Sequence, residues 1–536
     1  MIIPSSVLAA TWIPFSVVLL VELVLCVVFV QYFASRKRRE CGSFLVCILG
    51  LLVALLSSSL LPVDIFLVSF AKENGQFKEW AASKESRNEM NELMQYAYYG
   101  LYGLDMLFVF GILPFAFFYN QSRDEADEDN HLSSRCVSAL KWTTAFVLFA
   151  ALLLTLGALI PLRETPGSNS SISDLEWIIP KLGNDRGENS LALVVNIFTT
   201  LGVFFLCFYG AYGMAAMPVS WIFGRLSLES TRDDLVTSEQ ALKVRIESAK
   251  KRNGRIKEVA RMEGELEDVR RQLGILEQME AKWCCAKCFL LCRPFQFLAG
   301  LIFFAISLFV VGVIVTTNLD RILNGEGYRY GYVINGTAWV NPIDYVLTQL
   351  QVAFPIDYIV LVCLLVYIVM CVVAGIVHSG IRICCVSLYK IRPRKTKPEA
   401  LLFLVYILIF SILAVNVLFF SIAPGYYSYG TQTWNNATVN GTKSVKCADH
   451  PKPEECVKTA NADFLLAYFY KMWVFGAIYY WSNWLFVSIF LAGLVFRCAR
   501  GRPKATDAHF QREYDSEDED NEMSEDNDPL LPAFRP

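Results

Sequence analysis

Three aspartates lie inside or beside long apolar stretches of this sequence, where carboxylates have few uses other than specific chemistry. Asp64 follows Pro62 by two residues, Asp357 follows Pro355 by two residues, and Asp105 lies deep in a third apolar run. A charge at membrane depth costs about 2.5–3.5 kcal/mol on insertion scales, so each marks a candidate functional site. Such a carboxylate can bind a polar solute, make a polar contact between helices, or cap a helix start, where acidic groups favour the helix dipole.

Position within the apolar run indicates which role each aspartate favours. Asp344 and Asp357 lie near the predicted lumenal interface, each two residues after a proline, where capping the start of a helix explains them. For the deeper Asp64 and Asp105, a path for a polar solute and a buried polar contact between helices are comparable interpretations. Three asparagines in apolar runs are expected to hydrogen-bond between helices: Asn196, Asn416 and Asn483.

Cysteines form two groups with different expected chemistry. Cys447 and Cys456 lie in a short polar segment before the last apolar run, and an oxidising lumen would join them in a disulfide. Closing a loop of this size would stabilise it by roughly 2–3 kcal/mol. The second group lies just before the sixth apolar run and consists of Cys284, Cys285, Cys288 and Cys292. It has no nearby histidine and no second cysteine cluster, so a metal site is not predicted. Palmitoylation of these cysteines and unmodified thiols at the membrane surface are both open interpretations.

The elements that position these residues are helices, because nine long apolar runs occupy most of the chain. Of the 536 residues 54% are hydrophobic and 18% are charged, against about 45–50% and about 25% in soluble domains. Runs of about 20 apolar residues match the hydrocarbon thickness of a bilayer, and they lack the alternation of a barrel strand. The predicted fold is therefore an all-α polytopic bundle with spans at 12–33, 43–69, 94–119, 141–162, 191–217, 296–317, 356–378, 400–422 and 472–496.

Charges and glycosylation sequons orient these spans. Basic clusters follow the first, seventh and ninth spans at residues 36–39, 390–397 and 497–504. Because cytosolic loops carry an excess of Lys and Arg, the N-terminus is predicted to be lumenal and the C-terminus cytosolic. The lumenal side then receives four sequons, which need lumenal access for glycosylation: Asn169, Asn335, Asn436 and Asn440.

The sequence between spans five and six predicts a cytosolic helical segment. Apolar residues at 259, 262, 266, 269, 273 and 276 repeat by three and four, which gives a helix with one apolar stripe. Asn253-Gly254 breaks the helix upstream, so we expect a helical hairpin whose arms pack on each other. The competing interpretation is an intermolecular coiled coil, which would make the protein a homodimer. The expected organisation is residues 1–217 with spans one to five, 218–295 in the cytosol, and 296–496 with spans six to nine.

Residues 497–536 form an acidic tail with a candidate sorting signal. The tail is too polar to bury a core and is expected to be disordered. Asp526, Leu530 and Leu531 match the acidic dileucine pattern that clathrin adaptors bind as an extended peptide.

Several function classes lack their motifs in this chain. No phosphate-binding loop of the G-x-x-x-x-G-K-[ST] type occurs, so the chain has no ATP site of this kind to drive a pump. Neither H-E-x-x-H nor G-x-S-x-G occurs, and an enzyme is not predicted. A net charge of −3 gives no basic signature for nucleic acid, and membrane lipids are the expected surroundings.

Several strings resemble the limb-region-type membrane protein family. The resemblance runs from the first span to the last and is carried by residues 60–69 (LLPVDIFLVS), 211–218 (AYGMAAMP), 318–320 (NLD), 354–359 (FPIDYI), 388–392 (LYKIR) and 398–403 (PEALLF). It implies a lysosomal membrane protein needed for cobalamin, vitamin B12, to leave the lysosome. Cobalamin would be a transported substrate, with no covalently bound cofactor. A lysosomal ABC transporter and a cytosolic cobalamin-processing chaperone are the implied partners.

Two other functions compete with cobalamin export. One is an endocytic receptor for a protein ligand such as a lipocalin. Other members of the wider family resemble receptors of this kind. The other is a stand-alone solute channel that uses Asp64 and Asp105. The lumenal loops are short, which favours a role in cobalamin export over a role as a receptor for a protein ligand. The chain has no ATP site of its own, which favours a protein that assists a transporter over a primary pump.

Overall fold

The structure is a computed structural model, and the parts of the chain that it describes form two compact units. These are Met1–Met214 with Ser307–Gly493, and Ala215–Ile306 with Leu494–Pro536. Described are residues 5–35, 41–73, 75–124, 132–159, 188–223, 286–325, 341–350, 356–383, 386–389, 396–438, 441–448, 455–471 and 473–499, with scattered positions between them.

Nine helices among the described residues are long and apolar enough to cross a membrane, which confirms the predicted number of spans. Helix is the expected state because a chain in lipid must satisfy its backbone hydrogen bonds internally. Two spans contain a short π-helical stretch. The spans are α1 (Ser5–Phe33), α2 (Cys41–Phe70), α3 (Lys84–Leu107) with η2 (Phe108–Ile112) and α4 (Leu113–Asp124), α5 (Leu132–Leu159), α7 (Glu188–Phe205) with η4 (Leu206–Gly210) and α8 (Ala211–Phe223), α11 (Ala286–Asn324), α13 (Ile356–Ser379), α14 (Pro398–Ile422) and α17 (Trp473–Ala499).

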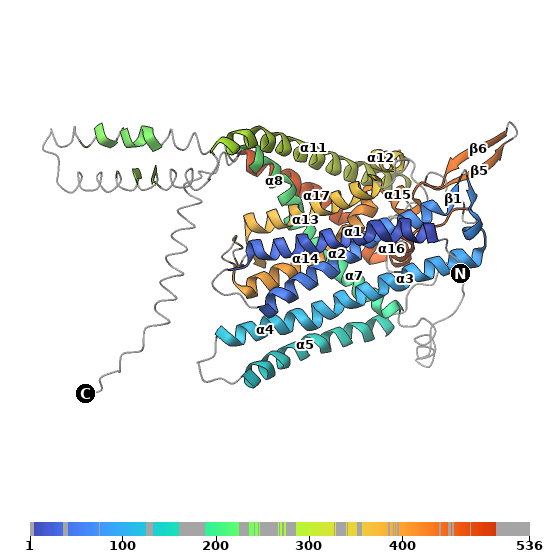
Figure 1. The fold of residues 1–536 in the computed structure, drawn as a ribbon, viewed down its shortest axis with the longest axis horizontal. Coiled ribbons are helices and arrows are strands. Elements are labelled where there is room, and N and C mark those ends of the chain that lie inside the picture. Colours follow the sequence, from blue (N-terminus) through green and yellow to red (C-terminus); the bar gives the residue numbers. More distant parts are fainter. Residues whose placement is uncertain are drawn as a thin grey trace. The chain divides into compact units, whose positions relative to one another are not determined.

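Short elements gather at one end of the larger unit, which we call the α16 end (Figure 1). They are η1 (Glu79–Ala81), α12 (Pro342–Leu350), α15 (Pro424–Tyr429), α16 (Ala460–Lys471) and two antiparallel pairs, β1 (Lys72–Glu73) with β2 (Gln76–Phe77) and β5 (Thr433–Thr438) with β6 (Gly441–Lys446). A third pair, β3 (Ile381–Ile383) with β4 (Val386–Tyr389), joins α13 to α14 at the opposite end. The prediction of an all-α fold named none of these hairpins, which are too short to leave a periodic pattern.

Helix α14 is the core of the larger unit. Its most apolar window is 89% buried, against 17% for α1 and for α5. It packs between α7 and α2, and Phe410 contacts the rings of Phe198 and Phe205 from α7. Helices α1 and α5 leave most of their apolar side chains exposed, as expected for faces that contact lipid.

At two helix crossings, glycines allow the backbones of neighbouring helices to come into direct contact. A Cβ on Gly202 of α7 would overlap the carbonyl oxygen of Phe410 in α14. Gly213 of α8 and Gly375 of α13 face each other's helices in the same way, against the carbonyl oxygens of Cys371 and Tyr209. Small residues allow this approach, which is how helices associate strongly in lipid.

Contacts at the two ends follow the alternation that threading through a membrane requires. At one end Ser35, just after α1, donates its N–H to the carbonyl of Thr396, just before α14, at 3.2 Å. At the same end the Tyr209 hydroxyl accepts the N–H of Arg382 at 3.1 Å. At the α16 end Thr431 donates its N–H to the Ser69 hydroxyl at 3.2 Å. Segments after odd-numbered spans therefore meet each other, and segments after even-numbered spans do likewise.

The smaller unit shows one packed contact between described helices. The ring of Trp221 in α8 meets Phe303 of α11 edge-on at 5.4 Å between centroids. Gly300 of α11 lies against Trp221 and Ile222, which allows the two helices to approach closely.

We predict that Gly202→Ala destabilises the bundle, because its methyl group would occupy the position of the Phe410 carbonyl. Overpacking of this kind costs about 1–3 kcal/mol. Gly103→Ala in α3 is the matched control, because nothing lies within 4 Å of a Cβ built there. Thermal unfolding of the full chain in lipid nanodiscs should show a lower midpoint for Gly202→Ala alone. Equal midpoints for the two variants would contradict the close helix crossing.

Candidate functional site

Asp64 caps the start of α16 from a different helix. Its two carboxylate oxygens accept the backbone N–H groups of Ala460 at 3.2 Å and Asn461 at 3.0 Å. The first N–H groups of a helix have no partner within the helix, and their partial positive charge favours an anion. Asp64 is 1% exposed, so water does not compete for these bonds. The deep carboxylate of α2 therefore makes a buried polar contact that fixes where α16 begins.

Asp344 performs the same task for α15. Its oxygens accept the N–H groups of Gly425 at 3.1 Å and Tyr426 at 2.8 Å. The start of its own helix, α12, is capped instead by Asn341, whose side-chain oxygen accepts the N–H of Ile343 at 3.0 Å. Asp344 lies in the first turn of α12 as the proline pattern indicates, but the helix that it caps lies elsewhere in the sequence.

Asp357 lies in the first turn of α13, and one of its oxygens accepts the hydroxyl hydrogen of Tyr426 at 2.7 Å. Capping of a helix start is therefore confirmed for Asp344, although the helix is α15 and not α12. Asp357 lies in the first turn of α13 as expected, but its hydrogen bond comes from the Tyr426 hydroxyl. Both aspartates contact α15, Asp344 through backbone N–H groups and Asp357 through the side chain of Tyr426.

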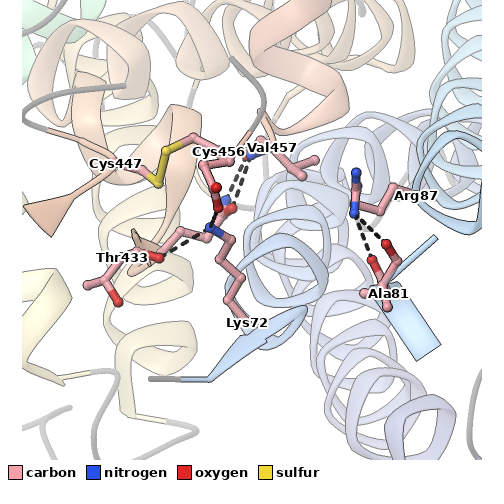
Figure 2. A network of polar contacts seen from close by, with 10 residues as sticks. Lys72, Ala81, Arg87, Thr433, Cys447, Cys456 and Val457 are labelled. Carbon is pink, nitrogen blue, oxygen red and sulfur yellow. Dashed lines mark hydrogen bonds and ion pairs between the residues drawn. A yellow bond between two sulfur atoms is a disulfide. The ribbon is translucent and has the colours of Figure 1, made fainter. Parts of the chain in front are cut away.

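A covalent and hydrogen-bonded loop follows α15. Cys447 and Cys456 form a disulfide, with Cα atoms 5.8 Å apart. The Gln432 side chain lies across this loop: its amide donates to the carbonyl of Val457 at 2.6 Å and its oxygen accepts the N–H of Val457 at 3.1 Å. Figure 2 shows Val457 beside the disulfide. The segment that leads into α16 is thus held before Asp64 caps it.

Lys72 ties the same loop to the end of α2. Its ammonium group donates to the carbonyl of Thr433 at 3.3 Å, as Figure 2 shows, and lies 3.8 Å from the Glu455 carboxylate. Burial lowers the pKa of Lys72 below its ordinary value, and the Glu455 charge opposes that change. Nearby, Arg87 donates to the carbonyl of Ala81 at 3.0 Å (Figure 2).

A row of buried polar side chains continues from Asp64 into the bundle. Tyr98, Tyr102 and Asp105 follow one face of α3 at spacings of four and three residues, and all are at most 5% exposed. Tyr98 lies next to Asp64, and Ser57 of α2 lies next to Asp105. Seven residues separate Asp64 from Ser57 and Tyr98 from Asp105, so the row is about 10 Å long at 1.5 Å per residue. We call these residues, with Asn416 of α14, Tyr427 of α15 and Asn461 of α16, the polar row.

The intramembrane asparagines differ in how their amides are used. Asn483 of α17 donates to Asn318 of α11 at 3.1 Å. The Tyr479 hydroxyl of α17 donates to the side-chain amide oxygen of Asn196 in α7 at 3.4 Å. The third expectation was wrong, because neither amide atom of Asn416 has a hydrogen-bond partner among the described residues.

Several predicted modification and sorting residues lie outside the described residues. They are Asn169, Asn335, Asn440, Cys284, Cys285, Asp526, Leu530 and Leu531. Asn436 of β5 and Cys288 and Cys292 of α11 belong to described backbone whose side chains are not described.

The tyrosines of the polar row were missed by sequence analysis. They carry a usable signal, since Tyr98, Tyr102 and Asp105 are the polar residues at positions i, i+4 and i+7 of one span. Lys72 was missed too, because nothing in a charged residue just beyond a span indicates that it is buried. Within the described part of the chain, no group of three His, Cys, Asp or Glu residues gathers as a metal site would require.

Together the fold and site define a polytopic helical membrane protein with a hydrogen-bonded, disulfide-closed end and buried acidic residues behind it. Residues 11–292 match the family of LMBR1-like membrane proteins. The chain belongs to this family, as the resemblance to limb-region-type proteins predicted.

Its relatives align along almost their whole length. The chain is 34% identical to a probable lysosomal cobalamin transporter of Nematostella vectensis, over 97% of this chain and 99% of that protein. It is 34% identical to the lysosomal cobalamin transport escort protein LMBD1 of Danio rerio, over 95% of this chain and 96% of that protein. The LMBD1 protein of Gallus gallus is also 34% identical, with 97% and 98% covered. No solved structure matches the chain.

We predict that Asp64→Ala loosens the start of α16. Two buried N–H groups would lose their acceptors, at about 1–3 kcal/mol each. Asp64→Asn keeps one acceptor oxygen and should lose less stability, because asparagine is also a good cap. Hydrogen exchange of the full chain in nanodiscs should show faster exchange at Ala460 and Asn461 in Asp64→Ala. Wild-type exchange at both amides would contradict the cap.

Proposed function

We propose that this protein takes part in the export of cobalamin from the lysosome, as an escort or co-transport partner of an ABC transporter in the lysosomal membrane. The observation that carries this proposal is the match to relatives named for lysosomal cobalamin transport, which extends over 97% of the chain in Nematostella vectensis.

The role of a partner, not of a primary pump, rests on what the chain contains. No nucleotide-binding loop of the Walker type occurs in the sequence. An ABC transporter in the same membrane would supply ATP hydrolysis, and a cytosolic cobalamin-processing chaperone would receive the vitamin. The name of the Danio rerio relative, a transport escort protein, favours this division of labour. Catalysis by the chain itself forms no part of the proposal.

The proposed orientation places the α16 end in the lysosomal lumen and the opposite end in the cytosol. The Cys447–Cys456 disulfide lies at the α16 end, and disulfides persist in oxidising compartments. Asn436 and Asn440 fall on the β5–β6 hairpin sequence at this end and would carry glycans. Asn169 and Asn335 follow spans four and six in the sequence, so the proposed orientation would place them in the lumen as well.

The cytosolic side would carry the division into domains predicted from the sequence, with a helical hairpin at residues 218–295. One contact supports antiparallel arms: Arg270 donates to the Glu239 carboxylate at 3.1 Å across 31 residues. Lys243 also lies 2.8 Å from this carboxylate, and the two cations lower the pKa of Glu239. Palmitoyl chains on the cysteines at 284–292 would hold the end of this segment at the membrane.

We predict that cells without this chain retain labelled cobalamin in their lysosomes, because the transporter lacks its partner. Re-expression of the full chain should restore release, and an ABC transporter should copurify with it in mild detergent. Normal release without the chain would contradict the proposal. Normal release together with loss of uptake of a lipocalin would indicate an endocytic receptor instead.

We predict further that Leu530→Ala with Leu531→Ala moves the protein from lysosomes to the cell surface, because clathrin adaptors bind the acidic dileucine pattern. Pro529→Ala is the control, since it changes the tail between Asp526 and the leucines but removes neither. Surface biotinylation measures the distribution. If the double variant still reaches lysosomes, the dileucine signal in the tail is not what directs the protein there.

A further inference from the structure

Polar atoms without partners concentrate in the polar row. Across the described residues, fifteen buried side-chain nitrogen and oxygen atoms have no hydrogen-bond partner, and seven of them belong to this row. Native proteins leave few buried polar atoms unpaired, since each costs about 1–3 kcal/mol. Seven in one row are therefore a local feature and not a scatter of small defects. They are the hydroxyls of Tyr98 and Tyr427, both carboxylate oxygens of Asp105, both amide atoms of Asn416, and the amide nitrogen of Asn461.

Asp105 is the extreme case in this row. It is 1% exposed, and neither oxygen has a hydrogen-bond partner among the described residues. Ser57 lies beside it, but the Ser57 hydroxyl donates to the carbonyl of Ala54 at 2.7 Å. No lysine, arginine or histidine of the described chain pairs with this carboxyl. An unpaired carboxylate anion is therefore strongly disfavoured at this position. The charge of Asp105 is neutralised only if the carboxylate binds a cation, which is either a proton or a metal ion.

Asp64 shows by contrast how a buried carboxyl of the neighbouring helix α2 is supplied with hydrogen-bond donors. It accepts two backbone N–H groups at the positive end of α16. The two acids are at opposite ends of the polar row, and one is compensated while the other is not. The row thus joins a carboxyl with two N–H partners at the α16 end to a carboxyl about 10 Å deeper that has no partner among the described residues.

The neighbours of Asp105 favour a proton over a metal ion. A hard metal cation takes about six or more oxygen ligands, whereas Ser57 and Tyr102 are the polar side chains beside this carboxyl. A proton needs one oxygen and no shell. Asn416, 3% exposed with both amide atoms unpaired, lies beside Tyr102 and provides a donor and an acceptor on the way.

We propose that Asp105 is a proton-binding site within the membrane, reached from the α16 end along the polar row. Uptake forms an O–H bond on a carboxylate oxygen and breaks one in hydronium, and nothing is oxidised or reduced. The titratable groups that face the row are Asp64 of α2, Tyr98 and Tyr102 of α3 and Tyr427 of α15, with Asp463 of α16 acting on Asp64. In the proposed orientation the proton comes from the acidic lumen, but the site itself does not depend on cobalamin.

The test is infrared difference spectroscopy of the full chain in nanodiscs, without cobalamin, between acidic and neutral pH. The wild type should show a protonated-carboxyl band that disappears on deprotonation. Asp105→Asn should lose this band, and Asp105→Glu should keep one at a shifted position. Asp357→Asn is the control, because that buried carboxylate contacts Tyr426 and lies outside the polar row. The elution volume in size-exclusion chromatography and the midpoint of thermal unfolding, both measured at acidic pH, check that each variant is folded.

Thermal unfolding gives an independent readout. If the folded protein holds a proton that the unfolded chain releases, wild-type stability falls as the pH rises, relative to Asp105→Asn. An unchanged band and an unchanged pH profile in Asp105→Asn would overturn the proposal. Loss of the band on adding sodium chloride at constant pH would also overturn it, since the occupant would then be a metal cation.

Discussion

The structure depends on one requirement: a helix that begins within or beside the membrane must find acceptors for its first N–H groups. Helices α15 and α16 both begin in buried surroundings. The residue before α15 provides no side-chain cap. Thr459, just before α16, accepts the N–H of Ala462, which leaves the N–H groups of Ala460 and Asn461 to find other acceptors. Asp344 and Asp64 supply the acceptors from α12 and α2. Because each carboxylate is buried, its negative charge is tolerated only opposite the positive end of a helix. The two pairs therefore stabilise both partners and determine how the α16 end is assembled.

A second constraint acts around α14. This helix is surrounded on nearly all sides, so its neighbours must fit its backbone as well as its side chains. Gly202 does so against the carbonyl of Phe410, and the π-helical stretch η4 lies one turn further along the same span. A π-helical turn changes which side chains face a neighbour, and such turns are frequent at functional sites. Here η4 carries Tyr209, whose hydroxyl binds the backbone of Arg382 on both sides, accepting from its N–H and donating to its carbonyl. The packing at the core and the hairpin at the β3–β4 end are thereby linked through one residue.

The sequence predicted the elements better than their contacts. Nine spans could be predicted because each is a run of apolar residues longer than any soluble helix needs, and that signal is local. The hydrogen bonds of Asp64, Asp344 and Asp357 could not be predicted, because their nearest partners in the sequence lie 396, 81 and 69 residues away. The Pro–Asp pattern indicated a helix start but not which helix. The Cys447–Cys456 pair was accessible because both cysteines belong to one short loop. The polar row could be predicted only in part from the sequence. Asp105 was identified as a candidate, whereas the tyrosines on the same face of its helix were not.

The distance in sequence between Asp64 and its partners has a consequence for biosynthesis. The ribosome makes Ala460 only 396 residues after Asp64. Until then a nascent chain inserted in order holds this carboxylate in its second span with no helix start to neutralise it. Until the final segment arrives, this carboxyl must be protonated, paired with other groups or in contact with water, because an unpaired buried carboxylate is costly. The α16 end therefore cannot be assembled before the C-terminal part of the chain is made, and a truncation before residue 460 would remove both N–H groups that Asp64 accepts.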